Sequence, residues 1–193
     1  MRVEIKGRTR AFDGFFKIEE SRVAWEQFDG SMGPERTRYV IRRGDSVGVL
    51  PVCNPHRSIV LVKQFRYPAV RQGSDGYLWE IPAGMVEKDE SPAATAHREL
   101  QEETGVEPES MEYSCSFFLS PGAMDEKFHL FIASISNENS IHTTGGSPEE
   151  DEDLLVKTFT QTRVREMIQK NRIMDAKTMC SLLYYFDIYS NKK

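Results

Sequence analysis

One short segment limits what this chain can fold into more than any other part of it. Residues 84–106 read GMVEKDESPAATAHRELQEETGV, and the middle of this segment carries the signals for both ends of a helix. Ser91 is a favoured N-cap residue, and Pro92 suits the first helical position, where a missing N–H costs nothing. Gly105 suits the left-handed conformation that ends many helices. The segment therefore predicts a loop, a helix that stops at Gly105, and a second loop.

Three glutamates of this helix, Glu99, Glu102 and Glu103, lie within roughly a third of its circumference, because successive residues are about 100° apart. Arg98 precedes Glu102 by four positions, close enough to pair with it. Carboxylates crowded in this way repel each other unless a cation neutralises them. Ligand sets made only of oxygen favour Mg²⁺ or Mn²⁺ over zinc. The alternative is a solvated acidic helix face, the usual meaning of an isolated acidic helix.

The rest of the chain mixes strand-like and helix-like segments. The continuous apolar run at residues 59–62 indicates a strand buried on both faces. Further strands are predicted at residues 77–81, 117–119, 128–133 and 154–159, and further helices at 164–169 and 176–189. The polar stretch 137–153 is predicted to be a mobile loop. This mixture indicates an α/β or α+β fold with a mostly buried sheet.

The first 44 residues read as short strands and turns, with an aromatic-rich stretch at 12–18 and a strand at 37–41. A three-stranded antiparallel unit of this size is marginally stable alone and needs something to pack on. We therefore divide the chain into an N-terminal β extension, residues 1–44, and a main domain, residues 45–193. The extension is expected to take part in forming a homodimer.

Composition excludes several classes of protein. The 193 residues carry 25 Lys and Arg against 30 Asp and Glu, a net charge of −5, which speaks against a sequence-blind nucleic-acid binder. Three widely spaced cysteines argue against a disulfide framework and suit a reducing cytosol. The sequence shows no signal peptide and no apolar run long enough to cross a bilayer. We expect a cytoplasmic protein that does not bind a membrane.

The spacing within residues 84–106 resembles the Nudix box, the loop–helix–loop signature of hydrolases that act on a nucleoside diphosphate linked to another group. All nine specified positions of that signature match. The resemblance implies an α/β/α sandwich from about residue 45 to the C-terminus. It also implies that Glu99, Glu102, Glu103 and the carbonyl of Ala83 bind Mg²⁺, with Mn²⁺ as a possible substitute. The resemblance also makes Arg98 a catalytic residue, which orients the glutamates together with Glu90.

Two further patterns resemble the ADP-ribose pyrophosphatase branch of this family. Pro121 follows Gly105 by 16 positions, and residues 62–66, VKQFR, look like a strand of that branch. The resemblance assigns substrate binding to one set of residues: Arg66, Trp25, Pro121, Gly122 and Glu126. Each has a structural alternative, namely a surface salt bridge for Arg66, ordinary packing for Trp25 and a strand-ending turn around Pro121.

In the same branch, the catalytic base comes from an acidic loop far downstream of the box. The acid run 149–153 matches that position. The resemblance favours Glu150 as the base and gives Glu152 as an alternative base or a metal-linked residue. By default such a run is a solvated loop.

Together these patterns predict a Mg²⁺-dependent pyrophosphohydrolase that cleaves ADP-ribose or a related nucleoside diphosphate sugar to a nucleoside monophosphate and a sugar phosphate. Glu103→Gln is expected to lower kcat by at least about 100-fold and to leave the fold intact, because it removes charge from a hydrated surface site. Two alternatives stay open: a hydrolase that prefers GDP-mannose, and a nucleotide-sensing Nudix module without turnover.

Overall fold

The computed structural model describes residues 1–71, 73–136, 140–146 and 152–190, and the chain forms two compact units. The first unit comprises Met1–Asp45 together with Phe118–Lys127, and the second comprises Ser46–Phe117 together with Phe128–Lys193. The first unit thus contains a segment from the middle of the chain that the sequence analysis did not place there.

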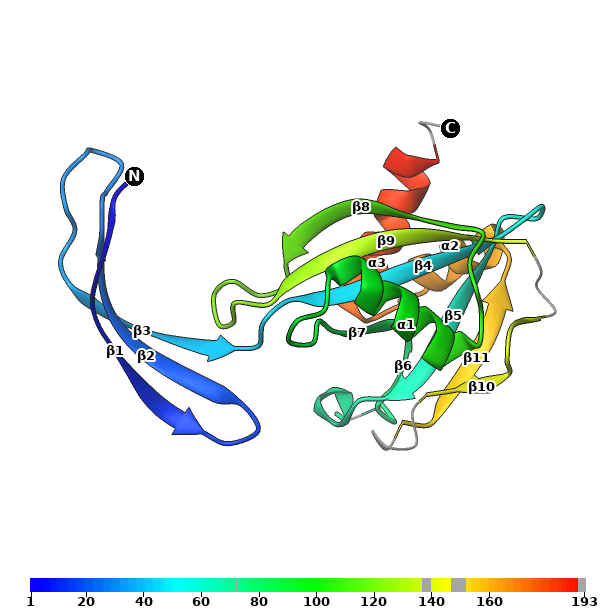
Figure 1. The fold of residues 1–193 in the computed structure, drawn as a ribbon, viewed down its shortest axis with the longest axis horizontal. Coiled ribbons are helices and arrows are strands. Elements are labelled where there is room, and N and C mark those ends of the chain that lie inside the picture. The colour runs from blue at the N-terminus through cyan, green and yellow to red at the C-terminus, as the bar shows by residue number, and fades with distance from the viewer. Residues whose placement is uncertain (72, 137–139, 147–151, 191–193) are drawn as a thin grey trace. The chain divides into compact units, whose positions relative to one another are not determined.

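The first unit is built on a three-stranded antiparallel sheet in the order β1-β2-β3 (Figure 1). The strands are β1 (Val3–Asp13), β2 (Lys17–Trp25) and β3 (Arg36–Arg42). The predicted three-stranded unit is confirmed, although β1 begins well before the aromatic stretch. The segment 118–127 joins the edge of β3, where the Ile41 N–H donates to the Ala123 carbonyl at 2.9 Å.

The second unit contains one eight-stranded mixed sheet. Its strands are β4 (Ser46–Cys53), β5 (Ser58–Phe65), β6 (Tyr77–Glu80), β7 (Ala83–Met85), β8 (Ser110–Phe118), β9 (Lys127–Ile135), β10 (Thr144–Gly145) and β11 (Leu154–Phe159). The main path runs β10-β11-β5-β4-β9-β8, and β6 and β7 are added to β5 and β4. β4 runs parallel to β9 along its whole length.

β4 is a strand that the sequence analysis missed, because Gly48 and Pro51 interrupt its apolar run. All eight of its residues are nevertheless buried. One edge of β4 pairs first with β7, at Ser46–Gly48, and then with β5, from Val52 onward. The N–H of Val49 points to that edge and donates to the Pro82 carbonyl. Pro51, two residues later, faces the same edge in the gap between the two ladders, so its missing N–H breaks no strand pairing.

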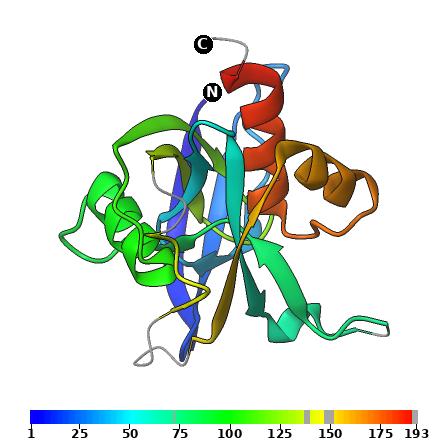
Figure 2. The same ribbon diagram turned by 90° about the vertical axis from the view of Figure 1, so that its right-hand side faces the viewer.

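Helices cover both faces of this sheet. They are α1 (Pro92–Thr104), α2 (Gln161–Gln169), α3 (Ala176–Tyr184) with the π-helical continuation η4 (Tyr185–Tyr189), and the short 3₁₀ turn η1 (Tyr67–Ala69). In Figure 2, α1 lies on one side of the sheet and α2 and α3 lie on the other. The predicted α/β/α sandwich is confirmed. Each helix in the described part of the chain is too short or too polar to cross a bilayer.

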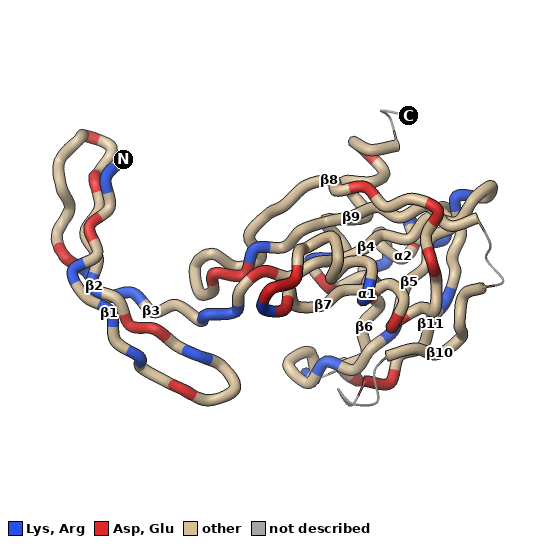
Figure 3. The backbone as a smooth tube through the Cα atoms, in the orientation of Figure 1, with Lys and Arg blue, Asp and Glu red and all other residues tan. Residues whose placement is uncertain are grey.

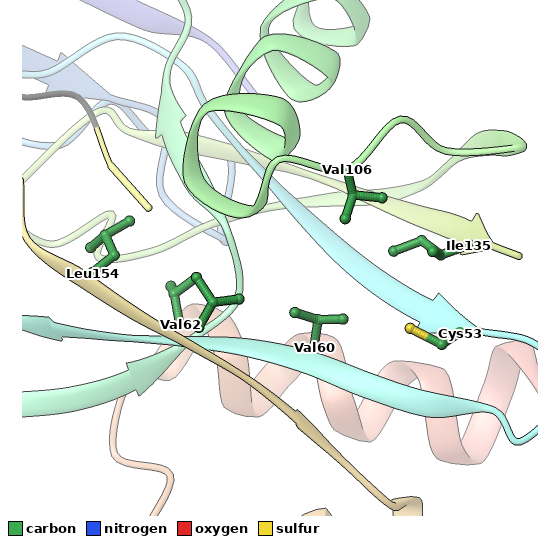
Figure 4. Packing of buried hydrophobic residues seen from close by; sticks show 7 residues of the cluster. Cys53, Val60, Val62, Val106, Ile135 and Leu154 are labelled. Carbon is green, nitrogen blue, oxygen red and sulfur yellow. The ribbon is translucent and has the colours of Figure 1, made fainter. Parts of the chain in front are cut away.

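Two clusters of buried side chains hold α1 and its flanking loop against the sheet. The first cluster comprises Val47, Val49, Ala96, Leu100, Phe131 and Ala133. The second lies beneath the C-terminal end of α1 and brings Val106 and Leu154 onto the side chains of β5 (Figure 4). Large-to-small changes in such clusters cost about 2–5 kcal/mol each. α1 therefore presents its polar face from a fixed position.

Candidate active site

The ends of α1 form as the sequence predicts. The Ser91 hydroxyl accepts a hydrogen bond from the Ala94 N–H at 3.2 Å, and Pro92 occupies the first helical turn. Gly105 adopts the left-handed conformation, with φ of 72°. Figure 3 shows acidic and basic positions side by side along α1 and along the loop that joins it to β7.

Glu103 is buried, with only 4% of its surface exposed. The expectation of a hydrated surface site is therefore wrong for this residue, which lies against β7 and β10. Its carboxylate accepts a hydrogen bond from the Ala83 N–H at 3.2 Å. Burial raises the pKa of Glu103 well above its ordinary value, and the charges of Glu152, Glu99 and Glu80 act in the same direction.

Glu99 lies one turn before Glu103 and is also largely shielded from solvent. Burial raises the pKa of Glu99 to about 7, and the charges of Glu102 and Glu152 add to the effect, although Arg98 opposes it. A Cβ atom built on Gly84 would overlap the Glu99 carboxylate. The glycine at position 84 thus has a direct cause, since the Glu99 carboxylate rests against backbone that carries no side chain.

Arg98 connects the acids of the segment. Its guanidinium lies 2.8 Å from Glu102, which confirms the predicted pair, and 3.0 Å from Glu99. The same group lies 3.4 Å from Glu90, which also accepts from the Thr95 hydroxyl at 2.7 Å. Arg98 and Glu90 are thus positioned to orient the glutamates, the role that the resemblance implies for them.

Glu152 reaches this region from the segment before β11. Its carboxylate accepts from the Gln64 side-chain amide at 3.2 Å, and its charge acts on both Glu99 and Glu103. The structure therefore brings three of the predicted acids together from distant parts of the chain. Glu150, the favoured base, lies outside the described residues.

The donor set suits a hard divalent cation, because it consists of carboxylate and carbonyl oxygens. In the described ranges, the Ala83 N–H is the one hydrogen-bond donor to Glu103, so the buried charge of this carboxylate is poorly compensated. Within the same ranges, no three metal-binding side chains converge closely enough to hold an ion as they stand. Glu102 explains part of this, because its carboxylate is turned toward Arg98.

Glu80 was not predicted as a site residue; it lies at the end of β6 and is 2% exposed. The two carboxylate oxygens of Glu80 accept from Nε and Nη2 of Arg66 at 3.0 and 2.9 Å. The Lys177 ammonium lies 3.9 Å from the same carboxylate. A charged residue within the apolar stretch YLWEIP is the signal that could have pointed to it.

The remaining predicted substrate-binding residues belong to the first unit. The Trp25 ring has the Arg38 guanidinium 5.0 Å from its centroid. Glu126 is buried and lies 3.5 Å from Nε of Arg43. Pro121 and Gly122 are exposed.

The chain also resembles known proteins in sequence. Residues 42–177 match the model of the NUDIX domain. The chain is 36% identical over 152 residues to a methanol dehydrogenase activator from Bacillus methanolicus, covering 79% of this chain and 77% of that protein. It is 33% identical over 180 residues to an ADP-ribose pyrophosphatase from Bacillus subtilis (strain 168), covering 86% and 92%.

A solved structure shows the same fold. The crystal structure of an ADP compounds hydrolase superposes with a TM-score of 0.74 and covers 100% of this chain and 96% of that one. The sequence identity is 16%, so this likeness concerns the fold alone.

Proposed function

The chain belongs to the NUDIX family and is a Nudix hydrolase, and on this basis we propose that it cleaves the diphosphate of ADP-ribose or a related nucleoside diphosphate sugar. Water adds to one phosphorus and the bridging P–O bond breaks, which yields a nucleoside monophosphate and a sugar phosphate. The observation that carries the proposal is that Glu99 and Glu103, both shielded from solvent on α1, lie near enough to Glu152 for the three negative charges to act on one another.

The cofactor in this proposal is Mg²⁺, with Mn²⁺ as a substitute. Glu99, Glu102, Glu103 and the carbonyl of Ala83 would hold it. When bound, a divalent cation neutralises the diphosphate and lowers the pKa of water. The raised pKa values of Glu99 and Glu103 support this assignment, because carboxylates in a site that lacks compensating charge bind a cation most favourably.

The other residues of the site position these ligands and move a proton. Arg98 holds Glu99 and Glu102 in place, and Ala83 fixes Glu103 through its N–H. Glu152, aligned by Gln64, or Glu150 takes the proton of the attacking water as general base.

Substrate contacts are assigned to Arg66, Trp25, Pro121, Gly122 and Glu126. Arg66 uses Nε and Nη2 for Glu80, which leaves Nη1 to donate to a phosphate. The buried Glu80 therefore fixes the orientation of the Arg66 guanidinium and does not occupy all of its N–H groups.

We also propose that the protein is a cytoplasmic homodimer, without nucleic-acid or membrane partners. The first unit supports the dimer, because its sheet buries few side chains. It instead exposes a group of apolar ones: Val3, Ile5, Phe12, Phe15, Phe28 and Tyr39. A second copy would cover such a surface.

A substrate panel tests the function. ADP-ribose, GDP-mannose, UDP-glucose, NADH and diadenosine polyphosphates are compared by kcat/KM with Mg²⁺ present, and the products are separated. ADP-ribose is expected to rank first and to give AMP and ribose 5-phosphate. A higher value for GDP-mannose would favour the alternative hydrolase, and binding without turnover of any substrate would favour a sensing module.

A further inference from the structure

A cleft of about 1090 Å³ opens in the second unit on the face of the sheet that carries α2, and we propose that it is a second binding site, for a nucleoside polyphosphate. Small-molecule sites commonly measure roughly 300–1,000 Å³, so the volume accommodates a ligand of this size. The cleft is lined from β5, β6, β11, α2 and the segment that follows α2.

The cleft and the candidate active site lie on opposite faces of the sheet. Lys63 of β5 and Trp79 of β6 are direct partners in the ladder, and both line the cleft. Successive residues of a strand point to opposite faces. The next residues along these strands, Gln64 and Glu80, therefore face the α1 side, where they contact Glu152 and Arg66. Lys63 and Trp79 of the cleft thus lie on the opposite face of the sheet from the acids of α1.

Positive charge is concentrated around the cleft. The whole chain has a net charge of −5, yet the cleft is lined by five cationic side chains and one carboxylate, Asp75. The cations are Lys63, Lys157, Arg163, Lys170 and Arg172. Arg163 pairs with Glu166 at 2.9 Å, whereas Lys63, Lys170 and Arg172 have no carboxylate of the described chain within ion-pair distance. Neighbouring like charges repel, and a bound polyanion removes that cost.

Aromatic rings also line the cleft. The Trp79 ring contacts Phe159 edge-on, with centroids 5.0 Å apart and planes at 88°. The Tyr77 ring is exposed, and the Lys63 ammonium lies 5.3 Å from its centroid. Trp79 and Phe159 are half-buried, so Tyr77 offers the most exposed ring. Aromatic rings next to cations suit a ligand that combines a planar base with phosphates. An inorganic anion alone would leave these rings unused.

Tryptophan fluorescence tests the site directly. The chain has two tryptophans, so Trp25→Phe leaves Trp79 as the reporter. ADP, pyrophosphate and adenosine are titrated separately with EDTA present, which keeps the proposed metal-dependent site from contributing. ADP is expected to quench the fluorescence saturably and to bind more tightly than either fragment, because it alone reaches both the rings and the cations.

Charge variants locate the binding. Lys63→Gln and Lys170→Glu are each expected to weaken ADP binding roughly tenfold, through loss of one charge-assisted contact. Arg36→Glu, at an exposed position of the first unit, is the matched control and is expected to change nothing. Dialysis of labelled ADP against the wild-type protein repeats the test without replacing a tryptophan.

Three results would overturn the proposal. The first is no saturable binding of ADP at millimolar concentration by either method, and the second is equal affinity in Lys63→Gln, Lys170→Glu and the parent. The third is that pyrophosphate, or a single-stranded RNA oligomer, binds far more tightly than ADP, since the ligand class would then be different. None of these results bears on hydrolysis, which the substrate panel measures.

Discussion

The carboxylate of Glu99 occupies the space in which Gly84 lacks a side chain. Gly84 belongs to β7 and Glu99 to α1, so this contact joins the two elements that form the site. Because the clashing atoms are the far end of a flexible side chain, an added methyl group would displace the carboxylate rather than the backbone. Gly84→Ala should therefore lower the activity strongly and the stability only slightly.

Gly84→Ala is expected to lower kcat by at least about 10-fold, because displacing a ligand from its productive position costs transition-state stabilisation. Thermal unfolding should show a small change in Tm. Gly7→Ala is the control, since its new Cβ meets the mobile end of Arg22 at 3.2 Å and lies in the other unit. Unaltered turnover in Gly84→Ala would mean that the position of Glu99 does not matter for catalysis.

Arg98→Ala tests the residue that orients the acids. The change removes the guanidinium that contacts Glu90, Glu99 and Glu102, and loss of such supporting contacts typically costs about 10–100-fold in metal affinity or activity. Steady-state kinetics over a range of Mg²⁺ concentrations should show a higher metal requirement. Arg22→Ala, which removes an exposed pair with Glu35, is expected to leave both quantities unaltered. An unchanged metal requirement in Arg98→Ala would contradict a positioning role.

Glu103→Gln keeps the shape of a buried side chain and removes its charge. We expect kcat to fall by at least about 100-fold, because a metal ligand is lost. The metal-free protein should be as stable as the parent or more so, since a desolvated carboxylate has been removed. Glu107→Gln, at an exposed position, is the control for both measurements. A marked drop in Tm together with full specific activity would show that Glu103 is structural.

The metal-free protein should lose stability as the pH rises. The pKa of Glu99 is raised from 4.5 to about 7, and that of Glu103 is raised as well, so the folded state binds more protons than the unfolded state in this range. The stabilising contribution is present below pH 4.5 and is lost through about pH 7. Urea unfolding with EDTA should show this decline, and Mg²⁺ should reduce it. A stability that increases over this range in EDTA would contradict the assigned burial.

The features that could be predicted from sequence depend on residues that lie close together along the chain. The helix α1 is specified by Ser91, Pro92 and Gly105, all within its own segment, and the structure confirms each of them. The pair between Arg98 and Glu102 follows from helical spacing alone. The strand β11 also matches its predicted range, because apolar residues begin directly after the acidic run.

The parts that could not be predicted depend on long-range pairing. Glu103 is buried where α1 meets β7 and β10, and no pattern within α1 reveals those contacts. The Arg66–Glu80 pair requires the register between β5 and β6. The strand β4 lies beside β9, some 80 residues away in sequence, and its glycine and proline conceal it locally.

Binding of Mn²⁺, followed by electron paramagnetic resonance, is the most direct test of the proposed metal site. Wild-type protein and Glu107→Gln should both bind Mn²⁺, and Mg²⁺ should displace it. Glu99→Gln and Glu103→Gln should each bind it at least about 10-fold more weakly, because each has lost a charged ligand. Wild-type protein that binds no Mn²⁺ even with a substrate analogue, or equal binding by all four proteins, would contradict the claim that these carboxylates form a metal site.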